Sequence, residues 1–295
     1  MTYAFYHSKD LDGWCCGYLF KVFLDNPTLI GWDYGDPLPD VLDNITDRDS
    51  VFIADISFPP DKLALICSKA GQVVWIDHHI SAIKAWEEYL QRNKIDDLQT
   101  RLKIDYLQTR LDTEHAACEL VFSFFNKGIF PAYISLLGSY DIFRGQGTAL
   151  WNEEILPYQY GMRLDVNSVD SLEQALKRPT EETIEIGKSI LKYQKTKNET
   201  AGLRAFEVEF KGVRAICLNT VEFNSQAFES IYNPLKHELM IPFAYDGKTK
   251  KWKYSLYTTH DLDCSLIAKS MGGGGHKKAA GFESEEQILF KYNSF

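Results

Sequence analysis

Acidic and histidine residues follow three short apolar segments in the N-terminal part of the chain. They come after segments 2–6, 50–54 and 72–76, and they are His7, Asp10, Asp12, Asp55, Asp77, His78 and His79. Each segment has the length and the β-branched or aromatic content of a strand. Because the carboxyl ends of strands in an open parallel sheet meet at one crevice, we expect these side chains to lie close together.

Helical segments separate the apolar segments, which indicates an α/β fold. Segments 14–24 and 60–69, and the stretch from residue 81 onward, have helical spacing and few helix breakers. Alternating strands and helices are typical of a parallel sheet covered by helices. We therefore predict an α/β chain with a parallel-sheet N-terminal domain, flanking helices, a helical connector and a smaller α/β C-terminal domain.

The predicted domain boundaries follow changes in this pattern. Residues 1–150 form the N-terminal domain, and residues 151–204 form a mainly helical and charged connector. From residue 205 strand-like segments return, with a helix near 225–232 and a hairpin through Asp246 and Gly247. We place the C-terminal domain at 205–295.

Composition limits the class of partner. The net charge of −9 disfavours binding of long nucleic acid, because non-specific affinity for a phosphate backbone depends on Lys and Arg. The six cysteines show no CxxC spacing, so we expect reduced core residues. The chain lacks a signal-peptide pattern and a stretch of about 18 consecutive apolar residues. We therefore predict a cytoplasmic protein without a membrane partner.

A tandem duplication lies in the stretch after residue 81. KIDDLQTRL at 94–102 is followed by KIDYLQTRL at 103–111. We interpret it as a surface helix lengthened by local duplication, because exposed elements tolerate insertions. The alternative is an arm that guides substrate or contacts a second copy in a homodimer. The oligomeric state is left open.

Each acid alone has an ordinary structural explanation. An Asp after a strand often forms a turn or caps a helix, which applies to Asp10, Asp55 and Asp141. Independent caps do not explain why acids recur at the same end of successive strands. The run of ionisable residues at 77–79, directly after a buried strand, rarely serves packing. The joint pattern therefore indicates a functional site.

Two divalent cations would suit such a site. Crowded carboxylates need cations to offset their repulsion, and carboxylate and imidazole groups are ligands for hard or borderline divalent ions. Two ions that share a carboxylate can activate water and neutralise phosphoryl oxygens. The sequence thus predicts hydrolysis of a phosphoester or phosphoanhydride. Arg144, close to Asp141 in the sequence, is a candidate for stabilising charge on the phosphate.

A glycine-rich segment, MGGGGHKKAAGF, lies at 271–282. Consecutive glycines let backbone amides approach an anion, and His276 and Lys277 add hydrogen-bond donors. The segment favours a phosphate pocket, and the alternative is a flexible loop with solvated lysines. A P-loop is excluded because no GxxxxGKS or GxxxxGKT pattern is present.

These motifs together resemble the DHH family of phosphoesterases, and the resemblance covers both predicted domains. The residues at 77–79 match the DHH motif, and those at 273–276 match the GGGH motif of the DHH-associated C-terminal domain. The other matching positions, in family order, are Asp10, Asp12, Gly13, Asp55 and Asp141.

The resemblance implies roles for these positions. Two cations, Mn²⁺ first and Mg²⁺ as the alternative, would be bound by His7, Asp10, Asp12, Asp55, His78 and Asp141, with Asp55 as the bridge. His79 would face the scissile phosphate and Asp77 would orient the neighbouring imidazole. A substrate phosphate would be held by Gly273, Gly274, Gly275 and His276, and the adjacent Lys277 is added from the sequence pattern itself. Family members with an N-terminal histidine ligand usually have one more residue between that histidine and the first Asp than lies between His7 and Asp10. The spacing of His7 therefore departs from the family pattern, whereas the positions of Asp10 and Asp12 match it.

The family acts on several phosphate substrates, so the substrate stays open. It includes single-strand exonucleases, oligoribonucleases, phosphatases of phosphoadenosine phosphate, cyclic-dinucleotide phosphodiesterases and pyrophosphatases. The acidic chain and the GGGH motif favour a nuclease acting on short oligonucleotides or small nucleotide phosphoesters, not on long duplex DNA. The alternatives are a phosphoadenosine phosphate phosphatase, a cyclic-dinucleotide phosphodiesterase and a non-catalytic nucleotide-binding protein.

Overall fold

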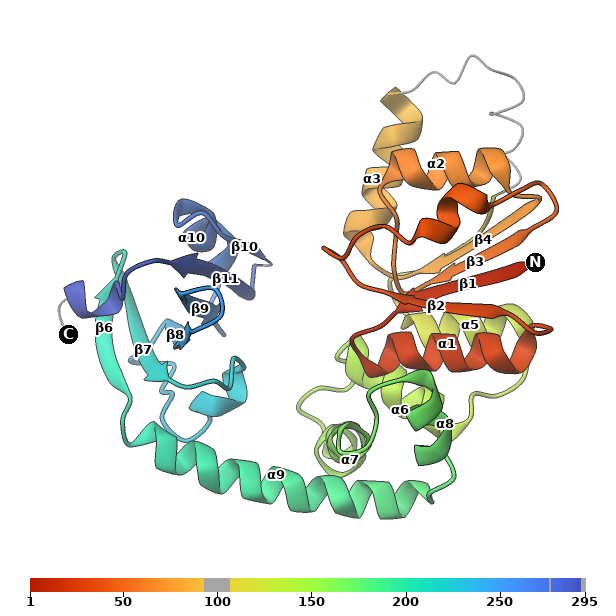
Figure 1. Cartoon of the computed structure of the whole chain (residues 1–295). Coiled ribbons are helices and arrows are strands. Elements are labelled where there is room, and N and C mark those ends of the chain that lie inside the picture. Colours follow the sequence, from red (N-terminus) through yellow and green to blue (C-terminus); the bar gives the residue numbers. More distant parts are fainter. Residues whose placement is uncertain (93–106, 276, 293–295) are drawn as a thin grey trace. The chain divides into compact units, whose positions relative to one another are not determined.

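A computed structural model describes residues 1–92, 107–275 and 277–292 (Figure 1). The chain divides into two compact units, Met1–Leu191 and Lys192–Phe295. The helical segment from 151 to 191 therefore belongs with the first unit, and helix α9 (Thr180–Gly202) contains residues of both. The boundaries at 150 and 204 stay a prediction.

The first unit contains the predicted parallel sheet. Its strands lie in the order β2, β1, β3, β4, β5, and all neighbours are parallel. The strand bounds are β1 Thr2–His7, β2 Thr28–Trp32, β3 Ser50–Ala54, β4 Gln72–Asp77 and β5 Gln108–Leu111. Tyr6 pairs with Ala54, and Ala54 pairs with Ile76. The carboxyl ends of β1, β3 and β4 are therefore level, which confirms the predicted architecture.

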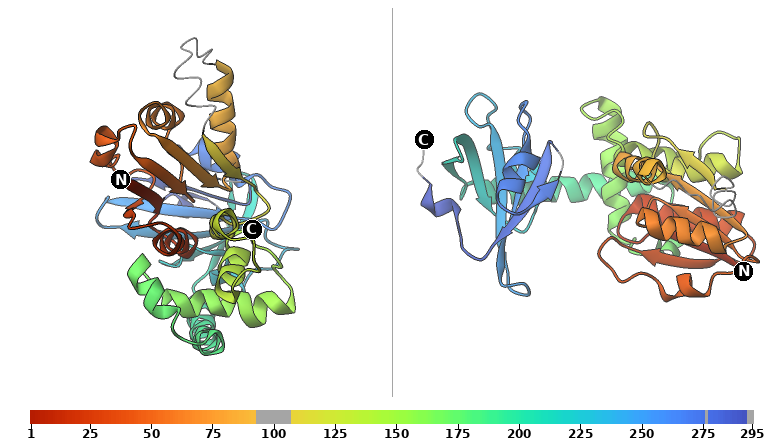
Figure 2. Two further views of the ribbon diagram at one scale, coloured as in Figure 1. Left: turned by 90° about the vertical axis from the view of Figure 1, so that its right-hand side faces the viewer. Right: turned by 90° about the horizontal axis from the view of Figure 1, so that it is seen from above.

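Helices cover both faces of this sheet (Figures 1 and 2). Helices α2 (Pro60–Lys69) and α3 (Ile80–Arg92) lie on one face, and α1 (Leu11–Phe23), α5 (Ala117–Phe125) and α6 (Ala132–Asp141) lie on the other. The strands read as continuous apolar runs because side chains on both faces are buried. Among the described residues, the unit also contains the helical segments η1 (Asp40–Asn44), the π-helix η2 (Trp151–Ile155), α7 (Leu156–Arg163) and α8 (Val169–Ala175).

The end of the duplicated segment forms a strand. Residues 108–111 are β5, in which Thr109 pairs with Trp75 and Leu111 pairs with Asp77. The helix interpretation is wrong for these residues, because hydrogen bonding to the exposed edge of β4 outweighs the helical pattern of the local sequence. Residues 93–106 lie outside the described part of the chain, so the rest of that interpretation stays a prediction.

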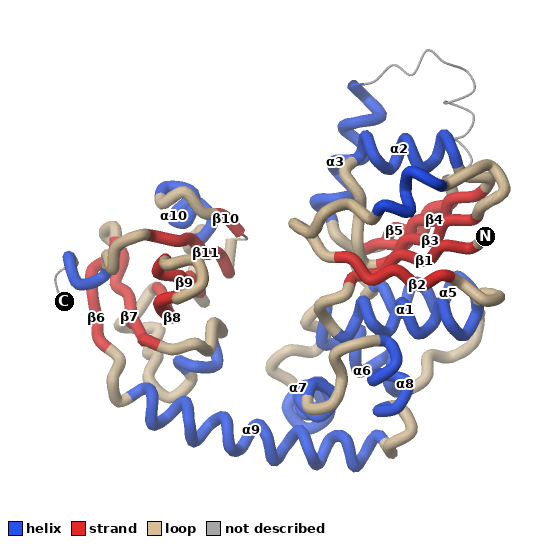
Figure 3. The backbone as a smooth tube through the Cα atoms, viewed as in Figure 1, coloured by secondary structure: helices blue, strands red, loops and turns tan. Residues whose placement is uncertain are grey.

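The second unit contains a mixed sheet with strand order β10, β11, β9, β8, β7, β6 (Figure 3). Its strands are β6 Phe206–Phe210, β7 Val213–Asn219, β8 Leu239–Asp246, β9 Lys251–Tyr257, β10 Gly274–Gly275 and β11 Ala279–Ser284. The predicted hairpin joins β8 to β9, and the helix expected near 225–232 is a short 3₁₀ helix, η3 (Ser225–Phe228). The described part of the unit also contains helix α10 (Cys264–Ser270) and η4 (Leu289–Lys291).

All six cysteines are buried and free, as expected. Burial raises the pKa of the Cys16 and Cys217 thiols, so both stay protonated at neutral pH. Within the described residues, none of the helices has both the length and the apolar character that a bilayer span requires.

Candidate metal centre

Acidic and histidine side chains gather at the carboxyl edge of the first sheet. Three groups of potential ligand atoms each lie within 4.8 Å of one another. The groups are Asp55, His78 and His79; His7, Asp10 and Asp55; and Asp12, His78 and Asp141. We call these seven residues the candidate metal cluster. Asp55 and His78 each belong to two groups, so neighbouring ion positions would share these side chains.

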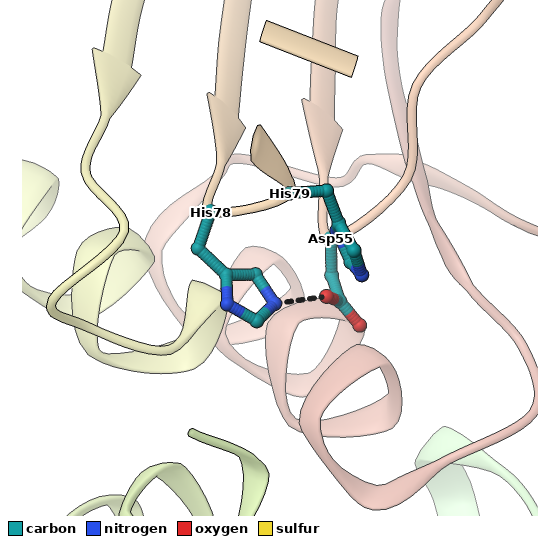
Figure 4. A group of neighbouring side chains, drawn as sticks. All are labelled: Asp55, His78 and His79. Carbon is teal, nitrogen blue, oxygen red and sulfur yellow. Dashed lines mark ion pairs between the residues drawn. The ribbon is translucent and has the colours of Figure 1, made fainter. Parts of the chain in front are cut away.

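Asp55 lies between two histidines of the cluster. It directly follows β3, and its Oδ1 atom lies 3.3 Å from Nε2 of His78 (Figure 4). Its Oδ2 atom lies 3.7 Å from Nδ1 of His7, is buried, and has no hydrogen-bond partner among the described residues. A buried carboxylate oxygen without a partner is costly unless a cation or a water binds it. The donor set therefore fits a divalent cation at this position.

Asp141 ends α6 and approaches the cluster from the helical layer. Its Oδ2 atom lies 3.3 Å from Nε2 of His78. Burial and the charge of Asp55 raise the pKa of Asp141 to about 7. Burial and the charges of Asp55 and Asp141 also hold the pKa of Asp12 well above its usual range. These carboxylates therefore repel one another, as expected for a site that binds cations.

Asp10 is both a helix cap and a member of the cluster. One oxygen, Oδ1, accepts a hydrogen bond of 2.9 Å from the amide of Gly13 at the start of α1. The other oxygen, Oδ2, lies 2.8 Å from Nδ1 of His7. A Cβ atom at Gly13 would lie 2.1 Å from the carbonyl oxygen of His7, so only glycine allows this close approach. The capping explanation thus accounts for one oxygen and leaves the other for a ligand.

The electrostatic environment of His7 is dominated by two carboxylates. Burial disfavours its charged form, but the hydrogen bond to Asp10 and the charges of Asp10 and Asp55 outweigh this and raise the pKa of His7 to about 11. In the metal-free protein the imidazole is therefore a cation that offsets part of the acidic charge.

Asp12 is held by the amino end of a second helix. Its two oxygens accept hydrogen bonds of 2.9 Å and 3.0 Å from the amides of Ala117 and Cys118 at the start of α5. The positive end of a helix dipole favours a carboxylate at this place. These two hydrogen bonds hold Asp12 in place within the cluster, where the residue is buried and only 4% exposed.

Asp77 positions His79 and is itself fully buried. Its Oδ1 atom lies 2.8 Å from Nδ1 of His79 and accepts the amides of His78 and His79. Its Oδ2 atom accepts the Ser57 hydroxyl and, at 3.3 Å, the Trp75 indole. The hydrogen bond with Asp77 raises the pKa of His79 to about 9. The network fixes the ring orientation of His79 and leaves its Nε2 atom for another contact.

Arg144 lies outside the three groups and is engaged elsewhere. Its guanidinium forms two hydrogen bonds, of 2.7 Å and 2.8 Å, with the two oxygens of Glu119, which is fully buried. It also donates to the carbonyl oxygen of Glu114. This bidentate geometry satisfies most of the guanidinium, so the structure gives Arg144 a positioning partner that the sequence did not reveal. Its action on phosphate stays a prediction.

The glycine-rich segment belongs to the second unit. Gly274 and Gly275 form β10 and pair with Gly281 and Ala280 of β11. Gly275 has a φ of +138°, a backbone conformation that residues with a Cβ atom rarely adopt. Nζ of Lys277 lies 2.6 Å from Oδ1 of Asp261, whereas Gly273 and Gly281 line a pocket of about 530 Å³. His276 lies outside the described residues, so its role stays a prediction.

Three contributors to the cluster's surroundings were missed from the sequence. Asp33 lies directly after β2, and its Oδ1 atom is 3.1 Å from Nε2 of His7. Placing the end of that strand at Trp32 would have found Asp33 by the same rule that found Asp55. Ser57 and Glu119 carry no comparable signal, because each acts through one partner distant in sequence.

Comparison with solved structures places this fold among known proteins. The sequence matches no protein-family model and no curated protein. An exopolyphosphatase-related protein from Bacteroides fragilis is 15% identical, covers 98% of this chain and 90% of its own, and gives a TM-score of 0.50. A pGpG-specific phosphodiesterase from Vibrio cholerae, PggH, is 13% identical over 98% of this chain and 95% of its own, with a TM-score of 0.49. The likeness to the Bacteroides protein is one of fold.

Proposed function

We propose that this chain is a phosphohydrolase that uses two divalent cations at the candidate metal cluster to cleave short oligonucleotides or small nucleotide phosphoesters. The observation that carries the proposal is the place of Asp55. Its carboxylate lies between His7 and His78, and its buried Oδ2 atom has no hydrogen-bond partner among the described residues. A metal ion or a water would satisfy this oxygen, and the crowding of other carboxylates around it favours a metal ion.

When bound, the cations supply positive charge that offsets the carboxylates, polarises phosphoryl oxygens and activates water. The protein's own part is to hold the ligands in place. The amino ends of α1 and α5 fix Asp10 and Asp12, and the buried Asp77 fixes His79. Because Asp77 holds Nδ1 of His79, the Nε2 side of the ring is left to donate a hydrogen bond to a phosphate oxygen.

The substrate class is argued from charge and from the second unit. The chain carries a net charge of −9, which disfavours long nucleic acid. Gly273, Gly274 and Gly275, with His276 and Lys277, offer donors for a terminal phosphate of a small substrate. The Bacteroides fragilis protein with a similar fold is named exopolyphosphatase-related, and this name supports the proposal that the present chain acts on a phosphate compound. We propose membership of the DHH family on the same grounds, with Mn²⁺ or Mg²⁺ as the cations.

The test is turnover by purified full-length protein with Mn²⁺ or Mg²⁺. The panel contains a dinucleotide, a longer single strand, phosphoadenosine phosphate, a cyclic dinucleotide and pyrophosphate. Asp55→Asn removes the shared charge, and Asp43→Asn, an exposed residue of η1, is the matched control. We expect dinucleotide cleavage that is lost with EDTA and in Asp55→Asn but kept in Asp43→Asn. Full turnover in EDTA or in Asp55→Asn would overturn the proposal, and nucleotide binding without turnover would favour a non-catalytic binding protein.

A further inference from the structure

A pocket of about 560 Å³ opens beside the candidate metal cluster, wholly within the first unit. It is formed by the loop after β2, the segment between β3 and α2, and the first turns of α3. Its volume is within the range of pockets that hold small organic ligands. None of the functions assigned above to the cluster uses this space.

Five phenylalanine, tyrosine and tryptophan rings are among the residues that line the pocket. Trp32 and Phe58 are stacked with ring centroids 4.9 Å apart, and Trp75 and Trp86 meet edge to face at 6.4 Å. These four rings are buried, so the floor of the pocket is fixed by core packing. Tyr34, whose side chain is 50% exposed, lies at the rim. The buried rings expose only a small part of their surface to the pocket, so the half-exposed ring of Tyr34 is the one available for stacking on a planar, apolar ligand.

Two side chains connect the pocket to the candidate metal cluster. His79 belongs to the cluster and also lines the pocket. The ring of Tyr34 lies 6.1 Å from that of His7, and its hydroxyl accepts a hydrogen bond of 3.0 Å from the amide of Ser57. The Ser57 hydroxyl in turn donates to Asp77, the carboxylate that holds His79. The pocket and the cluster therefore share walls, and one ligand can contact both.

We propose that this pocket binds a nucleobase of the substrate while the attached phosphate lies at the candidate metal cluster. The inference rests on the proposed function and adds to it a base-binding subsite. Every nucleobase has a planar face that stacks on aromatic side chains, which gives affinity with little dependence on base identity. A sugar phosphate without a base lacks this planar face, so it would gain no base stacking in the pocket.

The first experiment fills the pocket without removing its core residues. Ala85 is exposed, lines the pocket and lies on α3, so Ala85→Trp places a ring in the cavity. The adjacent Lys84 is exposed and does not line the pocket, so Lys84→Trp is the matched control. Substrates are a dinucleotide and the same compound without its bases. For the wild type and Lys84→Trp we expect a KM for the dinucleotide about tenfold below that for the base-free compound.

The expected result is that Ala85→Trp loses this tenfold preference and still cleaves the base-free compound like wild type. Equal KM values for both compounds in wild type, or an unchanged preference in Ala85→Trp, would overturn the proposal. If thermal unfolding shows that Ala85→Trp does not fold, Leu38→Asp replaces it, because Leu38 lines the pocket from an exposed loop. This variant puts a charge at the rim and has the same expected result.

A second measurement separates this inference from the proposed function. Tryptophan fluorescence, with three indoles in the pocket wall, reports equilibrium binding of a nucleoside monophosphate and of ribose 5-phosphate. If no substrate is cleaved but the nucleotide binds about tenfold more tightly than ribose 5-phosphate, and Ala85→Trp abolishes the difference, the pocket stands while the hydrolase proposal fails. If cleavage occurs and the two ligands bind equally, the pocket proposal fails alone.

Discussion

Nδ1 of His79 lies 2.8 Å from Oδ1 of Asp77, and Asp77 is fully buried at the carboxyl end of β4. The pair links the core of the first sheet to the candidate metal cluster. The hydrogen bond raises the pKa of His79 to about 9, while hydrogen bonds from His79 and Ser57 outweigh burial and lower the pKa of Asp77. The ion pair therefore exists at neutral pH in the metal-free protein.

This pair predicts a specific pH dependence of stability in the presence of EDTA. The folded-state pKa of His79 is above its unfolded value of about 6.5, so its contribution is full below about pH 6.5 and is lost as pH rises through about 9. Urea unfolding across this range should show the stability difference between wild type and Asp77→Asn shrinking with rising pH. A difference that stays constant from about pH 6 to about pH 10 would contradict the ion pair.

Cation binding should strengthen with pH because the ligands must lose protons. The pKa of Asp141 is raised to about 7 in the folded protein. Ionisation of this carboxyl therefore lowers the free energy of unfolding of the metal-free protein as pH rises from about 4 through about 7. Added Mn²⁺ should therefore raise Tm more at about pH 8 than at about pH 6. Differential scanning fluorimetry checks this, with Asp43→Asn behaving as wild type and Asp55→Asn losing the gain. An equal gain in Asp55→Asn would mean that the ion binds elsewhere.

The fold and the site were predictable from the sequence to different extents. The apolar segments gave the parallel sheet and the positions of Asp55, His78 and His79, because strand ends can be read from a local pattern. β5 was missed, since its formation depends on pairing with β4 and not on its own sequence.

Glu119 shows why the surroundings of a site are harder to predict. It looks like an ordinary residue of an apolar helix, and only the fold brings it to Arg144. Asp33 directly follows β2, so the rule that found Asp55 applies to it once the end of that strand is known.

The pairing of Arg144 with Glu119 gives a test of whether Arg144 acts on structure or on phosphate. Arg144→Met leaves a buried, uncompensated carboxylate and should lower the free energy of unfolding by about 3 kcal/mol. In the double variant Arg144→Met, Glu119→Gln the charge is gone, so we expect most of the stability and the turnover to return. Chemical denaturation and dinucleotide hydrolysis measure both quantities. Recovered stability with lost turnover would assign Arg144 to the reaction instead.

The duplication allows a deletion that leaves the strand sequence intact. Removing residues 94–102 keeps KIDYLQTRL, which supplies the complete β5 segment QTRL directly before Asp112. If the duplication is an insertion in an exposed element, as interpreted from the sequence, we expect the deletion variant to fold with a Tm within about 4 °C of wild type. Thermal unfolding measures this. A large loss of stability would show that the first copy packs against the unit.

Asp55 adopts a φ of +59°, a left-handed backbone that aspartate, asparagine and glycine tolerate best. Glutamate would carry the same charge but would not fit this backbone as readily. Asparagine and glycine are each one nucleotide change away from an aspartate codon, and neither carries a charge. If the proposed function holds, a single mutation in the gene could therefore remove the charge at position 55 while the chain still folds, which would be a short evolutionary route from an enzyme to a binding protein.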